Sequence, residues 1–299
     1  MKGVIAAVAT PVRDDGQMDV GVFERLVGFL AGAGVHGLCL GGATSEYPRT
    51  AIADRKAAID AARLNLRDGR LLLVGIGAST MHDVLDLGAH AFSAGAAAVL
   101  VPMPMFFRYA QADLRAYCAE VSRALRKPCL LYDLPEFTNG LAPETSIALM
   151  RDEEFIIGIK DSSGRPENLT AFAGARDGRD WTLLVGHDRL LADGFTTGWD
   201  GTVSGVAGFC PELPLAIYQA VAAGDGAQAT RLQAFVEELL VQFAALPAPW
   251  AVRIGLEVRG FPMGPFSLPL SAERARDVAA FRIWIDGWLQ RVHRAIEDR

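Results

Sequence analysis

The stretch FIIGIKDSSG, residues 155–164, begins with an apolar run that ends in a lysine. Because the run is continuous rather than alternating, it is typical of a parallel strand that is covered on both faces. Lys160 is one of only four lysines in the chain, which otherwise uses arginine for positive charge. A lysine at the end of a strand normally extends into water. Whether Lys160 instead has a functional role must be judged from the rest of the sequence.

Seven further apolar runs of similar length follow one another along the chain. They are VIAAVAT (4–10), VHGLCLG (35–41), LLLVGIG (71–77), AAVLVP (97–102), PCLLYDL (128–134), WTLLVG (181–186) and GTVSGVA (201–207). Stretches with helical spacing separate them, as in residues 22–34, where Phe23, Leu26, Val27 and Leu30 share one face. Eight strand–helix units over about 210 residues fit a closed (β/α)₈ TIM barrel better than an open doubly wound sheet.

The open sheet would also need a nucleotide-binding marker, which the sequence lacks. GIGAST, residues 75–80, supplies two glycines of a dinucleotide fingerprint but has Thr80 where the third would fall. No phosphate-binding loop of the Walker type occurs in the chain. We therefore expect the barrel.

After Pro211 the alternation stops and only helical spacing remains. In the last segment the apolar residues recur at intervals of three and four: Val278, Phe281, Ile285, Trp288 and Val292. We expect a barrel that carries the active site over residues 1–224, followed by a C-terminal helical subdomain over residues 225–299.

Composition excludes several kinds of partner. The formal net charge is −6 without long basic runs, which argues against nucleic acid and against an acidic membrane surface. No stretch reaches the about 18 apolar residues that a membrane span requires. The opening MKGVIAAVAT, residues 1–10, runs straight into PVRDDG and predicts a first strand rather than a leader peptide.

Cysteine and histidine spacing indicates neither disulfides nor a metal site. The cysteines form no CxxC pair and lie far apart, at Cys39, Cys118, Cys129 and Cys210. The histidines show neither HxH nor HExxH spacing, at His36, His82, His90, His187 and His293. We therefore expect a cytoplasmic protein that uses no metal or other cofactor.

Lys160 and Tyr132 are the strongest candidates for chemistry. In a (β/α)₈ barrel the active site lies at the C-terminal ends of the strands, and Lys160 ends the sixth strand while Tyr132 ends the fifth. Neighbouring strands lie about 5 Å apart, so the two side chains should be neighbours. Surrounded by Ile156, Ile157 and Ile159, the ammonium form of Lys160 should lose hydration, which favours the neutral amine that attacks a carbonyl to form a Schiff base.

A glycine-led loop follows the second strand: CLGGATSEYPRT, residues 39–50. Its backbone amides can converge on a carboxylate, and Thr44 and Ser45 add hydroxyl groups. Glu46 is either a general acid or a residue that stabilises the loop. By itself such a loop is more often a tight turn.

Together with four other motifs, however, this loop resembles one family. The motifs are GATSE (42–46), YDLP (132–135), GIKD (158–161), GHD (186–188) and GTVS (201–204). In order and spacing, from about residue 3 to residue 270, they resemble the superfamily of dihydrodipicolinate synthase and N-acetylneuraminate lyase. The opening GVIAAVATPVRDDGQMD, residues 3–19, is similar to the first strand and Thr-Pro turn of that family.

The resemblance implies a role for each matching position. Lys160 would form the imine with pyruvate or another 2-oxo acid, and Tyr132 would move protons. The remaining matches would bind substrate: Thr44 with the adjacent backbone of Ala43 and Ser45 at the carboxylate, Gly186 and Val203 along the pocket wall, and Asp188 at substrate hydroxyls. The resemblance also implies a homotetramer built as a dimer of dimers.

Three departures from the family pattern bear on specificity. Ala43 replaces the first hydroxyl of a Thr-Thr or Ser-Thr pair, and Phe106 stands where the family has a tyrosine that enters a neighbouring subunit's site. Phe137 replaces an arginine with which the synthases grip the carboxylate of the aldehyde substrate. Dihydrodipicolinate synthesis is therefore not the expected reaction, although it stays among the alternatives.

The sequence favours a Schiff-base-forming lyase or aldolase that links a 2-oxo acid, pyruvate, with an uncharged aldehyde. Its substrate would be a 2-keto-3-deoxy sugar acid or a related 4-hydroxy-2-oxo acid. A dehydratase of a keto-deoxy sugar acid on the same scaffold is the alternative, and a non-catalytic homologue that binds an oxo acid is the third hypothesis. The first two differ in their products, since only the lyase releases pyruvate.

Overall fold

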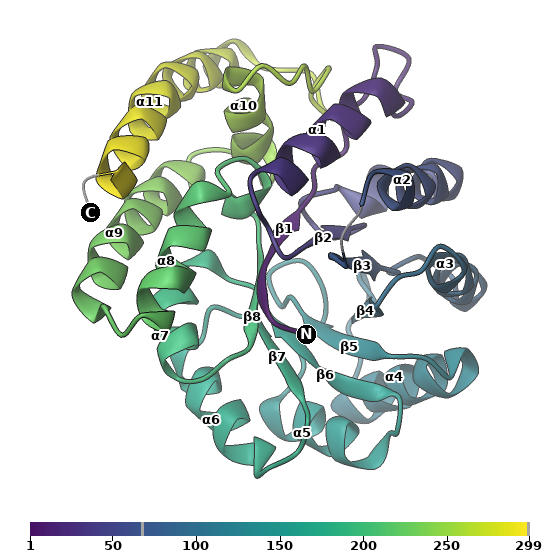
Figure 1. The fold of residues 1–299 in the computed structure, drawn as a ribbon. Coiled ribbons are helices and arrows are strands. Elements are labelled where there is room, and N and C mark those ends of the chain that lie inside the picture. The colour runs from purple at the N-terminus through teal and green to yellow at the C-terminus, as the bar shows by residue number, and fades with distance from the viewer. Residues whose placement is uncertain (67–68, 298–299) are drawn as a thin grey trace.

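The computed structural model describes residues 1–66 and 69–297, in which eight parallel strands close into a barrel surrounded by helices (Figure 1). The strands are β1 (Gly3–Ala7), β2 (Gly37–Leu40), β3 (Leu71–Gly75), β4 (Ala98–Pro102), β5 (Cys129–Asp133), β6 (Ile156–Asp161), β7 (Thr182–Val185) and β8 (Gly201–Ser204). Each strand pairs with the next, and β8 pairs with β1 to close the ring. Every strand overlaps one of the predicted apolar runs, which confirms the predicted (β/α)₈ fold.

Apolar side chains fill the inside of the barrel. They are Ile5, Ala7, Cys39, Leu73, Ala98, Leu100, Leu130, Tyr132, Leu134, Leu184 and Val203. The other faces of the strands pack against the surrounding helices in a second, larger core. Because each strand is buried on both faces, its sequence is apolar throughout rather than at alternate positions.

The helices of the barrel follow the strands in turn. They are α1 (Val20–Gly32), α2 (Ile52–Asn65), α3 (Met81–Ser93), α4 (Gln111–Leu125), α5 (Pro143–Asp152), α6 (Pro166–Arg176), α7 (Leu191–Thr196) and α8 (Glu212–Ala222). Short 3₁₀ turns η1 (Tyr47–Arg49), η2 (Asp188–Leu190) and η3 (Val206–Gly208) follow β2, β7 and β8. The predicted apolar face of α1 is buried, and the Asp19 side chain begins this helix by accepting a hydrogen bond from the Val22 amide at 3.0 Å.

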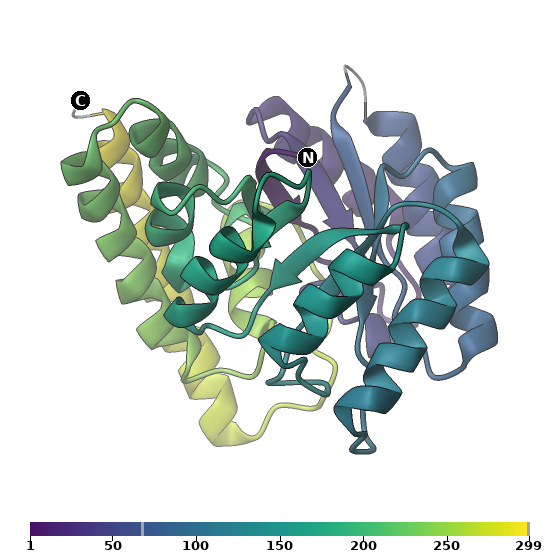
Figure 2. The ribbon, with the colours of Figure 1, turned by 90° about the horizontal axis from the view of Figure 1, so that it is seen from below.

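Three further helices form the C-terminal appendage: α9 (Gly226–Phe243), α10 (Trp250–Val258) and α11 (Ala272–Glu297). Helix α9 packs against α8, and α11 contacts α8, α9 and α10. Figures 1 and 2 show α9 and α11 together on one side of the barrel. The five residues predicted for the apolar face of α11 are all buried. The helical appendage is thus confirmed, whereas the domain boundary between residues 224 and 225 stays a prediction.

Strand β6 contains one residue more than its partner β5. Two consecutive residues of β5 pair with Ile156 and Gly158, so Ile157 is an extra residue in β6. Ile156 and Ile159 both belong to the outer core, whereas Ile157 packs against the inner one. An extra residue reverses the face on which the following side chains lie. Lys160 therefore points into the barrel, although it is four residues beyond the outward-facing Ile156.

Gly158 is expected to be essential for this irregular pairing. A Cβ atom at Gly158 would lie 1.9 Å from the carbonyl oxygen of Thr182 in β7, so the backbone would have to move. We predict that Gly158→Ala lowers the free energy of unfolding by about 3 kcal/mol in urea titrations. The control is Gly174→Ala on α6, where a Cβ meets nothing within 4 Å; it should leave stability unchanged or raise it by up to about 1 kcal/mol. Equal stability of the two variants would contradict the prediction.

Candidate active site

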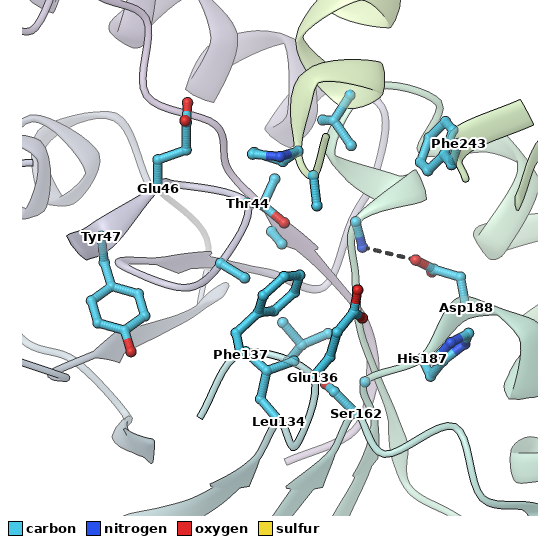
Figure 3. Close-up of a pocket in the computed structure, with 18 of the residues that line it drawn as sticks. Thr44, Glu46, Tyr47, Leu134, Glu136, Phe137, Ser162, His187, Asp188 and Phe243 are labelled. Atoms are coloured by element: carbon cyan, nitrogen blue, oxygen red, sulfur yellow. Dashed lines mark hydrogen bonds between the residues drawn. The ribbon is translucent and has the colours of Figure 1, made fainter. Parts of the chain in front are cut away.

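A cavity of about 430 Å³ opens at the C-terminal ends of the strands. Its walls come from the segments that follow β2, β4, β5, β6, β7 and β8. Residues of α9 and α10 and the segment between them, such as Phe243 and Val252, close one side (Figure 3). The barrel and the C-terminal helices therefore build this cavity together.

Lys160 and Tyr132 lie side by side in the cavity. They pair across β5 and β6, and the Lys160 Nζ atom lies 4.0 Å from the centroid of the Tyr132 ring. Both residues are buried, with 5% and 2% of their surface exposed. The predicted neighbourhood of the two side chains is confirmed. Lys160 thus presents a buried amine to the cavity.

Gly186, at the end of β7, leaves the space that Lys160 occupies. A Cβ atom there would lie 2.9 Å from Lys160 Cε and 2.1 Å from Ser162 Oγ. Ser162 also lines the cavity, and its buried hydroxyl oxygen has no hydrogen-bond partner among the described residues. The sequence reasoning missed Ser162. Alternation from Lys160 would have found it, because residues two apart point to the same side of an extended chain.

The loop after β2 presents Ala43 and Thr44 to the cavity, and the Thr44 side chain points into it (Figure 3). In the described part of the chain the amides of Ala43 and Thr44 have no hydrogen-bond partner. Ser45 was predicted to bind substrate, but its hydroxyl donates a hydrogen bond of 2.6 Å to the Val8 carbonyl oxygen. Ser45 lines a separate small cavity behind the loop. Its hydroxyl thus fastens the loop to the segment beyond β1.

Glu46 fixes the same loop from its other end. It has a left-handed backbone conformation with φ 51°, and its carboxylate forms an ion pair of 3.3 Å with Arg253 of α10. The Arg253 side chain is 3% exposed and also donates hydrogen bonds to the carbonyl oxygens of Met263 and Pro265, at 2.7 and 2.9 Å. Of the two roles considered for Glu46, these contacts favour stabilisation of the loop.

Asp188 also lines the cavity, at the start of η2. Its carboxylate accepts hydrogen bonds from the Ser204 hydroxyl and from the amides of Gly205 and Val206, at 3.2 and 3.3 Å. Figure 3 marks one of these bonds. Burial raises the pKa of Asp188, and the hydrogen bond from Ser204 opposes that shift. Val203, also predicted for the pocket wall, lines the same cavity.

The two phenylalanines that depart from the family pattern, Phe137 and Phe106, lie in different places. Phe137 lines the cavity and is 48% exposed. Phe106 is 91% exposed on the loop after β4. The centroid of its ring lies 4.9 Å from the centroid of the Phe107 ring. Four further polar residues line the cavity without having been predicted to bind substrate: Tyr47, Arg49, Glu136 and His187. Two of them, Glu136 and His187, follow strand ends closely, which is the signal that would have found them.

Within residues 1–66 and 69–297 no group of three or more His, Cys, Asp and Glu residues is placed to hold a metal ion. All four cysteines are buried and unpaired. No helix in these ranges combines the length and apolarity needed to cross a membrane. The functional groups that the cavity offers are an amine, a guanidinium, an imidazole, phenols, hydroxyls, carboxylates and backbone amides.

A cavity of this size and polarity, at the mouth of a (β/α)₈ barrel, defines an enzyme that acts on a small molecule. The sequence comparisons narrow this class. Residues 1–281 match the dihydrodipicolinate synthetase family, and the chain belongs to that family. It is a carbon–carbon lyase.

Individual relatives differ in the activities for which they are named. The chain is 29% identical to a probable 2-dehydro-3-deoxy-D-pentonate aldolase of Escherichia coli, over 92% of this chain and 94% of the relative. It is 32% identical to 4-hydroxy-tetrahydrodipicolinate synthase 1 of Streptomyces coelicolor, over 90% and 88%. The solved structure of Escherichia coli YagE in complex with pyruvate is 26% identical, superposes with a TM-score of 0.87 and covers 98% of this chain and 99% of its own.

Proposed function

We propose that the protein is a class I aldolase, in which Lys160 forms an imine with a 2-oxo acid and the adjacent carbon–carbon bond is broken or made. The observation that carries this proposal is the buried Lys160 amine, 4.0 Å from the Tyr132 ring centroid in the cavity. Lys56, by contrast, forms an ion pair of 2.6 Å with Asp86. Lys160 has the Tyr132 ring beside its amine, and within the described residues its amine takes part in no ion pair with a carboxylate.

The chemistry follows from these two side chains. In the cleavage direction the Lys160 amine adds to C2 of a 4-hydroxy-2-oxo acid. The new C2 hydroxyl leaves as water with a proton from the Tyr132 phenol, which gives the protonated imine and the Tyr132 phenolate. Tyr132 takes the proton of the C4 hydroxyl as the C3–C4 bond breaks, and the bonding electrons move to the imine nitrogen while the aldehyde departs. Protonation of the enamine at C3 by Tyr132 and hydrolysis of the imine release pyruvate and restore the lysine.

The residues around the amine have distinct binding roles in this proposal. The Thr44 hydroxyl and the amides of Ala43 and Thr44 hold the substrate carboxylate, and Ser45 supports them by fixing the loop to Val8. Gly186 leaves room for the lysine and its imine. Val203 forms part of the wall.

We expect an uncharged aldehyde product, and a substrate screen tests this. Phe137 offers an apolar face where a charged contact would bind a second carboxylate, and such a contact contributes about 1.5–3 kcal/mol. Pyruvate release from a 2-keto-3-deoxy sugar acid or another 4-hydroxy-2-oxo acid should therefore have a kcat/KM about 10- to 100-fold above that for condensation of pyruvate with aspartate semialdehyde. The relative named as a pentonate aldolase supports such a substrate. A preference for aspartate semialdehyde would contradict the proposal and favour dihydrodipicolinate synthesis.

A dehydratase is the second candidate, and Asp188 favours it. A carboxyl group whose pKa is raised by burial can hold a proton for a departing hydroxyl group. The imine would then acidify C3 of a keto-deoxy sugar acid, and water would leave without cleavage of the chain. The same screen separates the two candidates, since the dehydratase product retains all its carbons and no pyruvate appears.

The proposal extends to assembly and location. Phe106 and Phe107 stand exposed on one loop, which supports a homotetramer, built as a dimer of dimers, in which a neighbouring copy covers them. The four buried, unpaired cysteines support a reducing, cytoplasmic location.

A further inference from the structure

The segment after β5 places Glu136 and Phe137 together at the wall of the cavity (Figure 3). This segment is a tight turn, because the Leu134 carbonyl oxygen accepts hydrogen bonds from the amides of Phe137 and Thr138, at 3.1 and 3.0 Å. The Asn139 side chain ties the turn to the neighbouring loop through the carbonyl oxygen of Pro104, at 2.6 Å. The two residues at its tip are therefore held in place rather than carried on a long loop.

Glu136 brings an unneutralised charge to this position. It is exposed to the cavity, and within the described ranges its carboxylate takes part in no hydrogen bond or ion pair. The other carboxylates that line the cavity are already bonded, Glu46 to Arg253 and Asp188 to Ser204 and two amides. Glu136 thus has its acceptor capacity left for a ligand.

The charges around Glu136 define what it can accept. In the described residues the ionisable groups of the cavity wall, apart from the tyrosines, are Glu46, Arg49, Glu136, Lys160, His187 and Asp188. Lys160 is committed to the imine in the proposed function. Arg49 comes from the loop after β2 and also lines a third cavity, together with Arg253 and Pro265. Figure 3 labels Glu136 on the wall of the same cavity as Ser162, His187 and Asp188. A second carboxylate on the substrate would meet like charge there, whereas a hydroxyl would find an acceptor.

We propose that Glu136 determines specificity for the aldehyde half of the substrate: it accepts a hydrogen bond from a hydroxyl group and excludes aldehydes that carry a carboxylate. This inference rests on the proposed aldolase function and assigns the substrate class to a single residue. Phe137 beside it removes a favourable contact for a carboxylate, and Glu136 adds repulsion. The aldehyde that fits is therefore hydroxylated as well as uncharged.

The test compares kcat/KM for addition of pyruvate to two matched pairs of aldehydes. Butyraldehyde against succinic semialdehyde isolates the carboxylate, and glyceraldehyde against propionaldehyde isolates the hydroxyls. Glu136→Gln should reduce the preference for butyraldehyde over succinic semialdehyde about tenfold. It should also reduce the preference for glyceraldehyde over propionaldehyde about tenfold. Added salt should weaken the first preference in the wild type, because the charges are partly exposed to solvent.

Glu144→Gln is the matched control, since it removes an exposed charge from the first turn of α5, outside the cavity wall. Both preferences should be unchanged in this variant. Unchanged preferences in Glu136→Gln, or equal changes in the two variants, would overturn the inference and leave the aldolase proposal standing. Borohydride trapping of pyruvate by the wild-type protein tests the proposed function separately. Failure to trap would overturn that function and this inference with it.

Discussion

Incubation with pyruvate and sodium borohydride is expected to add one reduced adduct to the protein, on Lys160, and Lys160→Ala or Lys160→Arg should abolish both this adduct and turnover. Alanine removes the nucleophile. Arginine keeps the positive charge but cannot replace the amine, because a guanidinium does not deprotonate near neutral pH. Intact-mass measurement followed by peptide mapping locates the adduct, and pyruvate release measures turnover.

Lys127→Ala provides the control for this experiment. Lys127 is exposed on the segment between α4 and β5 and does not line the cavity. Both the adduct and the turnover of this variant should match those of the wild type. An adduct on another lysine, with Lys160 unmodified, would exclude the proposed mechanism.

Tyr132→Phe is expected to lower turnover by about 10²- to 10⁴-fold, the usual contribution of a positioned acid or base. The ring is 2% exposed and packs inside the barrel, and the substitution removes only its hydroxyl group. The packing should therefore survive, and thermal unfolding checks this. The borohydride adduct should still form, more slowly, because the Lys160 amine is unchanged.

Tyr47→Phe is the matched control, because Tyr47 is a second buried phenol that lines the same cavity. Burial raises the pKa of Tyr47 to about 12, so its phenol stays protonated at neutral pH and does not accept a proton. Its loss should lower turnover far less than the loss of the Tyr132 hydroxyl. Unchanged turnover in Tyr132→Phe would show that the phenol of Tyr132 is structural.

The sequence was sufficient for the barrel because its strands are buried on both faces. Continuous apolar runs marked all eight strands, and spacings of three and four marked the buried faces of α1 and α11. The pairing of Lys160 with Tyr132 was also predictable, because consecutive strands of this fold are neighbours and both residues end their strands.

Contacts between segments that are distant in the sequence could not be predicted from apolar runs and residue spacing. The ion pair between Glu46 and Arg253 joins residues 207 positions apart, and no local pattern encodes it. The hydroxyl of Ser45 looked available for substrate, but the carbonyl oxygen that it bonds belongs to Val8, 37 residues earlier. The free carboxylate of Glu136 is visible only once the turn that carries it is placed on the cavity wall.

Because of the extra residue in β6, the number of residues ahead of Lys160 decides which side chain faces the cavity. Lys160 faces the cavity only because Ile157 has been inserted ahead of it, whereas the next residue, Asp161, faces outward and bonds the Ser163 amide and the Asn168 side chain at 2.7 and 2.9 Å. Removal of a single residue from this stretch would exchange the two, and a carboxylate would replace the amine in the cavity. The length of β6 ahead of Lys160 is therefore not free to change by one residue.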